Sequence, residues 1–385
     1  MTKRMEFTRR QRENILFLVL ITMVALLMRY LLFPFESSDY HQFLQGWFTA
    51  LREGGGFAAV GMNIGDYMPT YLYLLAPLTY FPVSALTAVK LVSTLGDLVL
   101  AVAVMKTVNL NFSGKTYGIA AYALVLFLPS VFLNSAVWGQ CDAIYTAALV
   151  FCVYNLMRGR DLPAVISFSV AFVFKLQAVF LAPFVLLMLL RRKIRPSSLL
   201  AFPAVYLAAV LPAAALGRSL KDLLTIYYSQ AGQYTLVAMF LPNLYTWLPE
   251  STPVYISRAA VLLAGGLVLT ALFCLSRKNY RLTKGITVTL ALFFALMVPF
   301  VLPYMHERYN FPADILSVIF AFYFPRRWYL AAVIQVASAF VVCHNLFQTD
   351  FFSIQLLGVV MLFVILLVAQ HLVRQISENP GEEAA

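Results

Sequence analysis

The sequence predicts an all-α polytopic membrane protein, with about twelve transmembrane helices. Of its 385 residues, 62% are hydrophobic and only 12% are charged, whereas a soluble domain has about 25% charged residues. The mean hydropathy is +0.81. Apolar runs of about the 20 residues that a membrane helix needs recur along the chain. These features exclude a soluble enzyme, a disordered chain and a disulfide-rich secreted module, and the alternating strands of an outer-membrane barrel are missing.

The apolar runs give the predicted spans in order. The first follows a basic N-terminal stretch and has no small-residue cleavage site, so we interpret it as a retained helix rather than a signal peptide. A further apolar stretch at 69–84 is short, rich in tyrosine and interrupted by Pro77 and Pro82, which favours an interfacial or re-entrant segment over a span. The predicted spans lie near residues 13–33, 85–107, 117–134, 142–157, 162–175, 178–190, 198–216, 253–275, 285–303, 309–325, 328–346 and 352–373.

The basic residues predict the orientation of these spans. If the N-terminus is cytoplasmic, twenty of the 28 Lys and Arg residues fall on the cytoplasmic side and eight lie elsewhere. The positive-inside rule therefore explains the net charge of +11 and predicts that both termini are cytoplasmic. We expect one integral membrane domain over 1–385, with the lipid bilayer and no nucleic acid as a partner. The four cysteines form no metal-binding or disulfide pattern.

Two long loops, 34–84 and 217–252, are extracytoplasmic in this topology and carry amphipathic, aromatic-rich pieces. In the first, Ser37 or Ser38 is predicted to cap an interfacial helix that starts at Asp39 and ends at the glycines from Gly54 onward. Loops on a rigid scaffold often carry function. The chemistry of the protein is therefore expected at the outer face.

Several polar residues at this face have both an ordinary and a functional interpretation. Asp39 is either a helix cap or a reactive carboxylate, and Asp66 is either part of a turn or a substrate ligand. Lys175 lies between two short apolar runs, where a charge is costly and usually functional, and it suits a lipid phosphate. Asp97 lies midway along a span and is expected to pair within the helix bundle.

Two further motifs sit at the same face. In Trp138–Asp142, Gln140 and Asp142 are candidates to bind sugar hydroxyls with Trp138 stacked on the ring, although an interfacial tryptophan and a helix-start aspartate explain them equally well. In Met305–Tyr309, His306 and Arg308 are candidate phosphate ligands beside Glu307. The alternative for this run is a loop salt bridge between Glu307 and Arg308.

With these motifs the sequence resembles the GT-C-fold glycosyltransferases that use polyprenyl-phosphate sugars. It is most similar to the bacterial relatives of the second mannosyltransferase of GPI-anchor synthesis, and it also resembles the dolichyl-phosphate-glucose-dependent glucosyltransferases of N-glycan assembly. Five segments carry the resemblance in order: Asp39-Tyr40, Gly65-Asp66-Tyr67-Met68-Pro69, Trp138-Gly139-Gln140-Cys141-Asp142, Phe174-Lys175-Leu176-Gln177 and Met305-His306-Glu307-Arg308-Tyr309.

The resemblance implies a role for each segment. Asp39 is the expected catalytic base in the first outer loop, and the donor phosphate is expected at Lys175, His306 and Arg308. The predicted substrate-binding residues are Asp66, Tyr67, Gln140, Asp142 and Glu307.

The implied reaction moves a mannose- or glucose-like hexose, with inversion, from a polyprenyl-phosphate donor to a glycan or lipid-linked acceptor. It takes place at the extracytoplasmic face of a bacterial plasma membrane. We expect no cofactor and no metal, although Asp39 and Asp66 could in principle share a metal ion. A transporter or flippase for a lipid-linked saccharide and a non-enzymatic assembly partner remain as alternatives.

Overall fold

The computed structural model describes residues 9–112, 114, 116–231, 236–249, 251–349 and 351–381. The predicted topology counts Lys3, Arg4 and Lys115 among the cytoplasmic basic residues, and these three residues lie outside the described set. The α-helices are α1 (Arg9–Leu32), α2 (Gln45–Glu53), α3 (Pro69–Leu75), α4 (Ala85–Val108), α5 (Thr116–Phe127), α6 (Pro129–Phe132), α7 (Asp142–Met157), α8 (Asp161–Phe174), α9 (Ala182–Leu190), α10 (Ala201–Ala215), α11 (Leu220–Ala231), α12 (Val254–Arg277), α13 (Lys284–Val301), α14 (Phe311–Tyr323), α15 (Trp328–Phe347) and α16 (Ile354–Glu378).

Shorter elements connect them. Two π-helical turns are η1 (Tyr40–Leu44) and η4 (Leu133–Trp138), and the 3₁₀ turns are η2 (Gly56–Gly61), η3 (Ala76–Tyr80), η5 (Leu176–Leu181), η6 (Pro196–Leu200) and η7 (Pro325–Arg327). Two short strands, β1 (Ala238–Met239) and β2 (Met305–His306), pair in parallel. This pair was not predicted, and it attaches the second long loop to the loop before α14.

The helices confirm the predicted polytopic membrane fold. Within the described residues, seven helices are long and apolar enough to cross a membrane, and a bent pair, Thr116–Phe127 with Pro129–Trp138, makes an eighth candidate. The four remaining predicted runs are also helical, but with 10–17 residues each they are shorter than a full span. At 1.5 Å per residue such helices fall short of a hydrocarbon core of about 30 Å.

Proline explains the bend in the pair formed by α5 and α6. The helix axis turns by 50° at the junction. Leu128 is extended there and Pro129 begins the next helix, because a proline disfavours helical geometry in the residue before it and has no N–H to donate. The bend turns the following segment, η4, toward the first outer loop.

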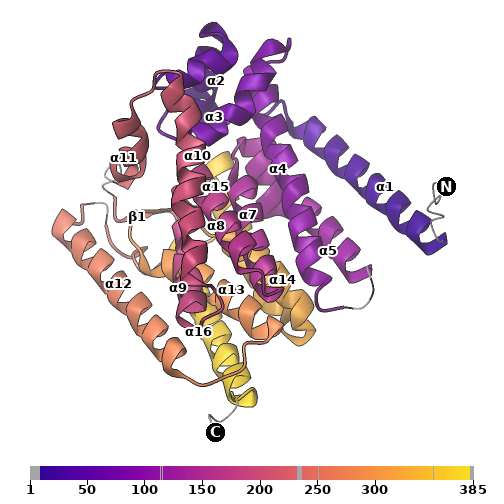
Figure 1. The fold of residues 1–385 in the computed structure, drawn as a ribbon, viewed down its shortest axis with the longest axis vertical. Helices are drawn as coiled ribbons and strands as arrows, with labels where there is room; N and C mark the ends of the chain where they lie inside the picture. Colours follow the sequence, from indigo (N-terminus) through magenta and orange to yellow (C-terminus); the bar gives the residue numbers. More distant parts are fainter. Residues whose placement is uncertain are drawn as a thin grey trace.

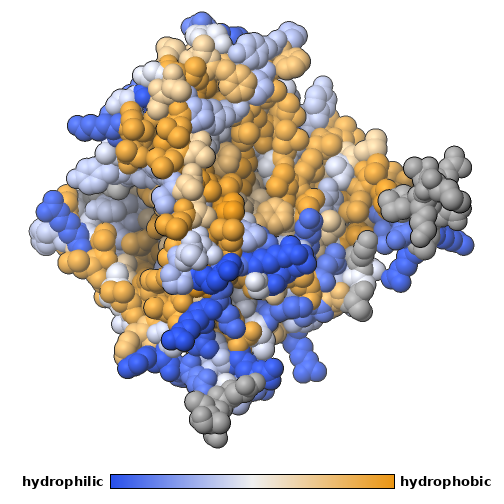
Figure 2. All heavy atoms as spheres, in the orientation of Figure 1, coloured by the Kyte–Doolittle hydropathy of each residue, from blue (hydrophilic) through white to orange (hydrophobic). Residues whose placement is uncertain are grey.

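The packing separates a central bundle from peripheral helices. Residues of α4, α7, α13 and α14 form much of the buried core. In contrast, α1 buries only Ala25 and Arg29, and it stands apart at one side of the molecule while α12 stands at the other (Figure 1). Hydrophobic residues cover much of the visible face, and hydrophilic ones gather toward its lower end (Figure 2). Apolar surface of this extent suits a lipid environment.

Buried ion pairing holds α1 to the bundle. Arg29 Nε lies 2.8 Å from Asp97 Oδ2, and both side chains are buried. Ser135 also donates to Asp97, so the expectation that Asp97 pairs within the bundle is confirmed. A second buried carboxyl, Asp314 of α14, was not singled out from the sequence, and it accepts a hydrogen bond from Ser338 at 2.6 Å.

The first long loop folds largely as predicted. Residues 38–53 form one helical segment through η1 and α2, and Ser37 Oγ accepts a hydrogen bond from the Tyr40 N–H at 3.2 Å. Helix α2 ends at Glu53, Gly54 caps it, and Gly55 follows with a left-handed φ of 89°. The stretch 69–84 forms α3 and η3 rather than a span-length helix, and its buried residues pack into the bundle.

Candidate functional site

Asp39 is positioned by hydrogen bonds from a neighbouring segment. Its Oδ2 accepts from Trp138 Nε1 at 3.0 Å and from Gln140 Nε2 at 2.5 Å. Ser37, two residues earlier, donates to the Trp138 carbonyl at 2.8 Å. The Asp39 side chain is 22% exposed, and its Oδ1 has no hydrogen-bond partner among the described residues. One carboxylate oxygen is thus fixed while the other remains open.

The Trp138–Gln140 segment has this geometry because of Gly139. The π-helical turn η4 ends at Gly139, which has a φ of 82° and donates to the Ser135 carbonyl. Where the backbone at a helix end is left-handed, glycine is the favoured residue. The reversal directs both Trp138 and Gln140 toward Asp39.

Trp138 does not provide the stacking face that we predicted for a sugar ring. It is 1% exposed, and the Arg308 guanidinium carbon lies 5.1 Å from its ring centroid. Burial leaves no open ring face, so the residue orients Asp39 instead.

Lys175 is held at the predicted buried turn between two short helices. It follows α8 in an extended conformation, with η5 after it. Its Nζ lies 2.5 Å from Asp142 Oδ1, and both side chains are buried. Asn134 donates to the other Asp142 oxygen at 2.8 Å. The Lys175 ammonium also lies 5.6 Å from the Tyr67 ring centroid.

Arg308 connects this pair to Asp39. Its Nη1 lies 3.7 Å from Asp39 Oδ2, and its Nε lies 3.9 Å from Asp142 Oδ2. The four residues therefore form a series of alternating charges, Asp39, Arg308, Asp142 and Lys175, which we call the charge chain. Arg308 Nε is buried without a hydrogen-bond partner among the described residues.

Glu307 forms the loop salt bridge that the sequence allowed. Its Oε1 lies 3.1 Å from Arg308 Nη1, and its Oε2 lies 3.6 Å from His306 Nδ1. Burial raises the pKa of Glu307, but the hydrogen bond from His306 and the Arg308 charge outweigh it, so the pKa lies below its usual value. Burial likewise lowers the pKa of Arg308, whereas the Glu307, Asp39 and Asp142 carboxylates raise it well above the ordinary value. Both groups are therefore charged.

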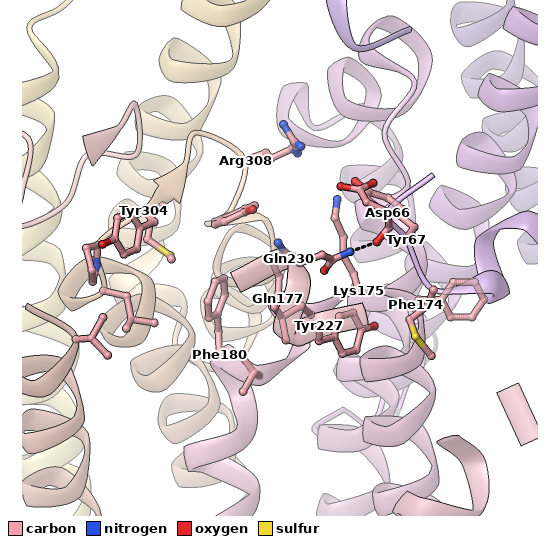
Figure 3. Close-up of a pocket in the computed structure, with 18 residues that line it drawn as sticks. Asp66, Tyr67, Phe174, Lys175, Gln177, Phe180, Tyr227, Gln230, Tyr304 and Arg308 are labelled. Carbon is pink, nitrogen blue, oxygen red and sulfur yellow. Dashed lines mark hydrogen bonds between the residues drawn. The ribbon is translucent and has the colours of Figure 1, made fainter. Parts of the chain in front are cut away.

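Two adjacent cavities meet at the charge chain. The Lys175 cavity, of about 320 Å³, is lined mainly by apolar and aromatic residues, with Lys175 and Arg308 among the polar ones. Figure 3 shows these two side chains entering it from different segments, with Asp66 and Tyr67 beside Lys175. The Asp39 cavity, of about 360 Å³, is more polar and is lined by Asp39, Gln140, His306, Glu307 and Arg308, among others. Asp66, Tyr67 and Arg308 line both cavities.

The structure thus brings the predicted site residues close to one another, but it distributes them over two cavities. His306 and Glu307 line the Asp39 cavity rather than the Lys175 cavity. Asp142, predicted to bind a sugar, is not among the lining residues of either cavity and instead pairs with Lys175 and Asn134. The Asp66 carboxylate makes no hydrogen bond or ion pair with the described residues, whereas its backbone carbonyl accepts from Gln230.

No group of three or more His, Cys, Asp and Glu side chains suited to a metal ion occurs within the described part of the chain. Asp39 and Asp66 therefore have no third His, Cys, Asp or Glu ligand for a shared metal ion within this part of the chain.

The comparison with protein families decides the class of the protein. The sequence pattern of glycosyltransferase family 87 matches residues 67–299, more than half of the chain. The chain belongs to glycosyltransferase family 87. The predicted enzyme class is therefore confirmed. The matched region of this family 87 glycosyltransferase includes Tyr67, Gln140, Asp142 and Lys175, while Asp39 and the His306–Arg308 run lie outside it.

A solved structure supports the fold of this family 87 glycosyltransferase. The chain is similar to ArnT from Cupriavidus metallidurans, solved bound to undecaprenyl phosphate, with a TM-score of 0.53 and 14% sequence identity. The match covers 92% of this chain and 77% of ArnT. It confirms the predicted GT-C-like architecture. No curated protein matches the chain, and the relation to the GPI-anchor mannosyltransferase stays a prediction.

Sequence reasoning missed several residues at the site of this glycosyltransferase. Asn134, which fixes Asp142, lies in a run interpreted only as a span. Trp47 packs edge-on to Tyr67 at 5.0 Å and lines the Asp39 cavity. Tyr227 and Gln230 of α11 line the Lys175 cavity. The amphipathic character of the 217–252 loop was the one signal that pointed to α11.

Proposed function

We propose that this family 87 glycosyltransferase moves a hexose from a polyprenyl-phosphate donor to a glycan or lipid-linked acceptor, with Asp39 as the general base. The observation that carries the proposal is the charge chain, which sets Asp39 in one cavity and Lys175 in the adjoining one, with Arg308 shared by both. A negatively charged leaving group and a proton acceptor thus have separate, neighbouring places. The undecaprenyl phosphate bound to ArnT supports a polyprenyl-phosphate carrier here as well.

The Lys175 cavity suits the donor phosphate and the first part of its lipid chain. It combines apolar walls, such as Leu176, Phe180 and Leu302, with two cations, the buried Lys175 and the mostly buried Arg308. A phosphate taken out of water needs such charged partners, because an unpaired buried charge is very costly. Arg308 can bind two phosphate oxygens through its planar guanidinium, whereas Lys175 acts as a point charge.

The Asp39 cavity suits the transferred sugar and the acceptor. Its polar lining includes Gln140, Glu307 and Asn345, whose oxygen and nitrogen atoms match sugar hydroxyls. Asp39 lies at this side of Arg308, so a donor phosphate bound by Arg308 would present its sugar toward Asp39.

The proposed step transfers one proton and one glycosyl group. Asp39 Oδ1 accepts the proton of the acceptor hydroxyl, whose oxygen bonds to the anomeric carbon as the bond from that carbon to the donor phosphate oxygen breaks. The electron pair of the broken bond stays on the phosphate, and the donor diester leaves as a polyprenyl phosphate monoester. Attack from the face opposite the phosphate inverts the anomeric configuration. Lys175 and Arg308 stabilise the charge that grows on the leaving oxygen, so one carboxylate is sufficient, unlike the pair that a glycosidase uses.

We further propose that the reaction occurs at the extracytoplasmic face of a bacterial plasma membrane. The distribution of basic residues supports this face, since the site lies on the loops that the positive-inside rule places outside.

Replacing Asp39 with Asn tests the base. The amide cannot accept the acceptor proton, so we expect the turnover number to fall by about 10²- to 10⁴-fold. The assay incubates purified protein in detergent with polyprenyl-phosphate mannose or glucose and a bacterial membrane extract as the acceptor source, and it measures the release of free polyprenyl phosphate. Because no gradient or second compartment is present, wild-type release supports an enzyme and not a flippase.

Glu53→Gln is the matched control, because Glu53 is an exposed acid at the end of α2. It should retain wild-type turnover. Melting temperatures of both variants should equal that of the wild type. Near-normal turnover of a folded Asp39→Asn variant would contradict the assignment of the base.

A further inference from the structure

A third cleft opens at the end of the molecule away from α2 and α3. It lies between the start of α13, the η7 turn and the last turns of α16, whose C-terminal end is at the bottom of Figure 1. Its volume is about 840 Å³, which is far more than the roughly 30 Å³ that one water molecule occupies in the liquid. The cleft shares no lining residue with the two cavities of the candidate site.

The lining of this cleft has an excess of positive charge. Arg326, Arg327 and Arg374 contribute cations, and among the described residues Glu378 is the one acidic residue that lines it. Glu378 Oε1 is already 2.7 Å from Arg374 Nε. Neither Arg326 nor Arg327 forms an ion pair with an acidic residue among those that the structure describes. The two guanidinium groups are therefore available to an anion.

Two residues that line this cleft, His371 and Gln375, carry buried polar atoms without partners in the described part of the chain. Both ring nitrogens of His371 are shielded from solvent and have no hydrogen-bond partner among the described residues, and the same holds for Gln375 Oε1. The imidazole is held edge-on to the Phe324 ring, with centroids 4.6 Å apart. Native proteins leave few such atoms unsatisfied, and each one calls for a ligand or water. A neutral imidazole has one N–H to donate, and a phosphate oxygen accepts it.

The surroundings of the cleft are those of a membrane surface. Trp328 and Tyr329, at the start of α15, are 64% and 41% exposed, and such aromatic residues prefer the headgroup region. On α16, Phe363, Leu366 and Val373 are 60%, 53% and 51% exposed. These side chains give α16 an exposed apolar surface that acyl chains can cover.

We propose that this cleft binds the headgroup of an anionic phospholipid, with its phosphate against Arg326, Arg327 and His371 and its acyl chains along α16. Basic pockets between membrane helices commonly recognise such headgroups. A free phosphate ion would use the same cations, but it would leave the exposed apolar surface of α16 and most of the cleft volume unused. The proposal does not depend on the proposed transferase reaction.

Native mass spectrometry of the purified full chain, titrated with cardiolipin or with phosphatidylcholine, measures the binding. The wild type should retain cardiolipin in preference to phosphatidylcholine, and excess inorganic phosphate should not displace it. The double variant Arg326→Gln/Arg327→Gln should bind cardiolipin at least about tenfold more weakly, because each arginine near an anionic surface contributes about a fivefold effect. His371→Phe, which keeps the net charge and the aromatic packing, should weaken binding as well.

The control variant is Arg158→Gln/Arg160→Gln. It removes the same charge from an exposed loop between α7 and α8, outside the cleft. Cardiolipin affinity should then stay within about twofold of the wild-type value, because these two arginines attract the lipid only from a distance and salt screens that attraction. An equal loss in both double variants, unchanged affinity in His371→Phe, or displacement by inorganic phosphate would overturn the proposal. Transfer activity in the Arg326→Gln/Arg327→Gln variant should persist, which separates this site from the catalytic one.

Discussion

At the scale of single residues, Arg308 is the cation that the three carboxylates of the site share. Its guanidinium is within 4 Å of Glu307, Asp39 and Asp142. Three carboxylates this close would repel one another, and the shared cation offsets that repulsion. An incoming donor phosphate would add another anion next to the same group.

Variants at Lys175 can separate an effect on donor binding from an effect on protein stability. In Lys175→Met the Asp142 carboxylate stays buried without its ammonium partner, and breaking a buried pair in this way costs about 3–5 kcal/mol. We therefore expect a lower melting temperature together with a raised Michaelis constant for the polyprenyl-phosphate sugar.

The double variant Lys175→Met/Asp142→Asn serves as the control for this prediction. It removes both charges, and the amide oxygen introduced in place of the Asp142 carboxylate would still accept from Asn134, so thermal stability should recover most of the loss. The Michaelis constant should remain high because the phosphate still lacks its cation. A double variant that regained wild-type donor use would show that Lys175 acts only through folding.

At the scale of elements, the π-helical turn η4 converts a membrane helix into part of the site. The turn gives Trp138 and Gln140 their direction only because Gly139 adopts a φ of 82°. In Gly139→Ala, a left-handed alanine costs about 1–2 kcal/mol, and its Cβ would lie 3.3 Å from Val89 Cγ1. We expect lower stability and a turnover number reduced by about tenfold or more, because Asp39 would lose one or both of its hydrogen bonds.

Gly159→Ala is the comparison. Gly159 also has a positive φ, of 68°, but no atom lies within 4 Å of its added Cβ. The backbone penalty should therefore be similar while turnover stays at the wild-type level. If the two variants lost activity equally, the effect would come from stability and not from the position of Gln140 and Trp138.

The same elements explain what the sequence could predict. Hydrophobic runs and glycine, serine and proline signals act locally, so the helices and the cap at Ser37 were foreseeable. The outer polar motifs were found by residue type and order. Their partners were not, because the contacts of Asp142 with Asn134 and of Asp39 with Trp138 depend on tertiary packing. The burial of Trp138 and the β1–β2 pairing have no local sequence signal.

At the scale of the whole molecule, the two ends carry opposite kinds of sites. Asp39 of the charge chain lies in the helical segment that contains α2, whereas the basic cleft is lined by the last turns of α16, and Figure 1 shows α2 and the C-terminal end of α16 at opposite ends of the molecule. The cleft lies at the end where most basic loop residues are predicted, as the positive-inside rule requires of a cytoplasmic face. The two sites should therefore meet different leaflets of one bilayer.

Thiol labelling in intact cells tests this polarity. The background variant is Cys274→Ser, which removes the one exposed cysteine of the four. In this background, Ala58→Cys introduces a thiol at an exposed position beyond α2. Separately, Arg160→Cys introduces a thiol at an exposed position between α7 and α8. A membrane-impermeant maleimide should label Ala58→Cys in intact cells, and it should label Arg160→Cys only after the membrane is permeabilised. The Cys274→Ser parent gives the background signal. The reverse pattern would place Asp39 on the cytoplasmic side and most of the basic loop residues outside, against the positive-inside rule, and it would contradict the proposed extracytoplasmic site.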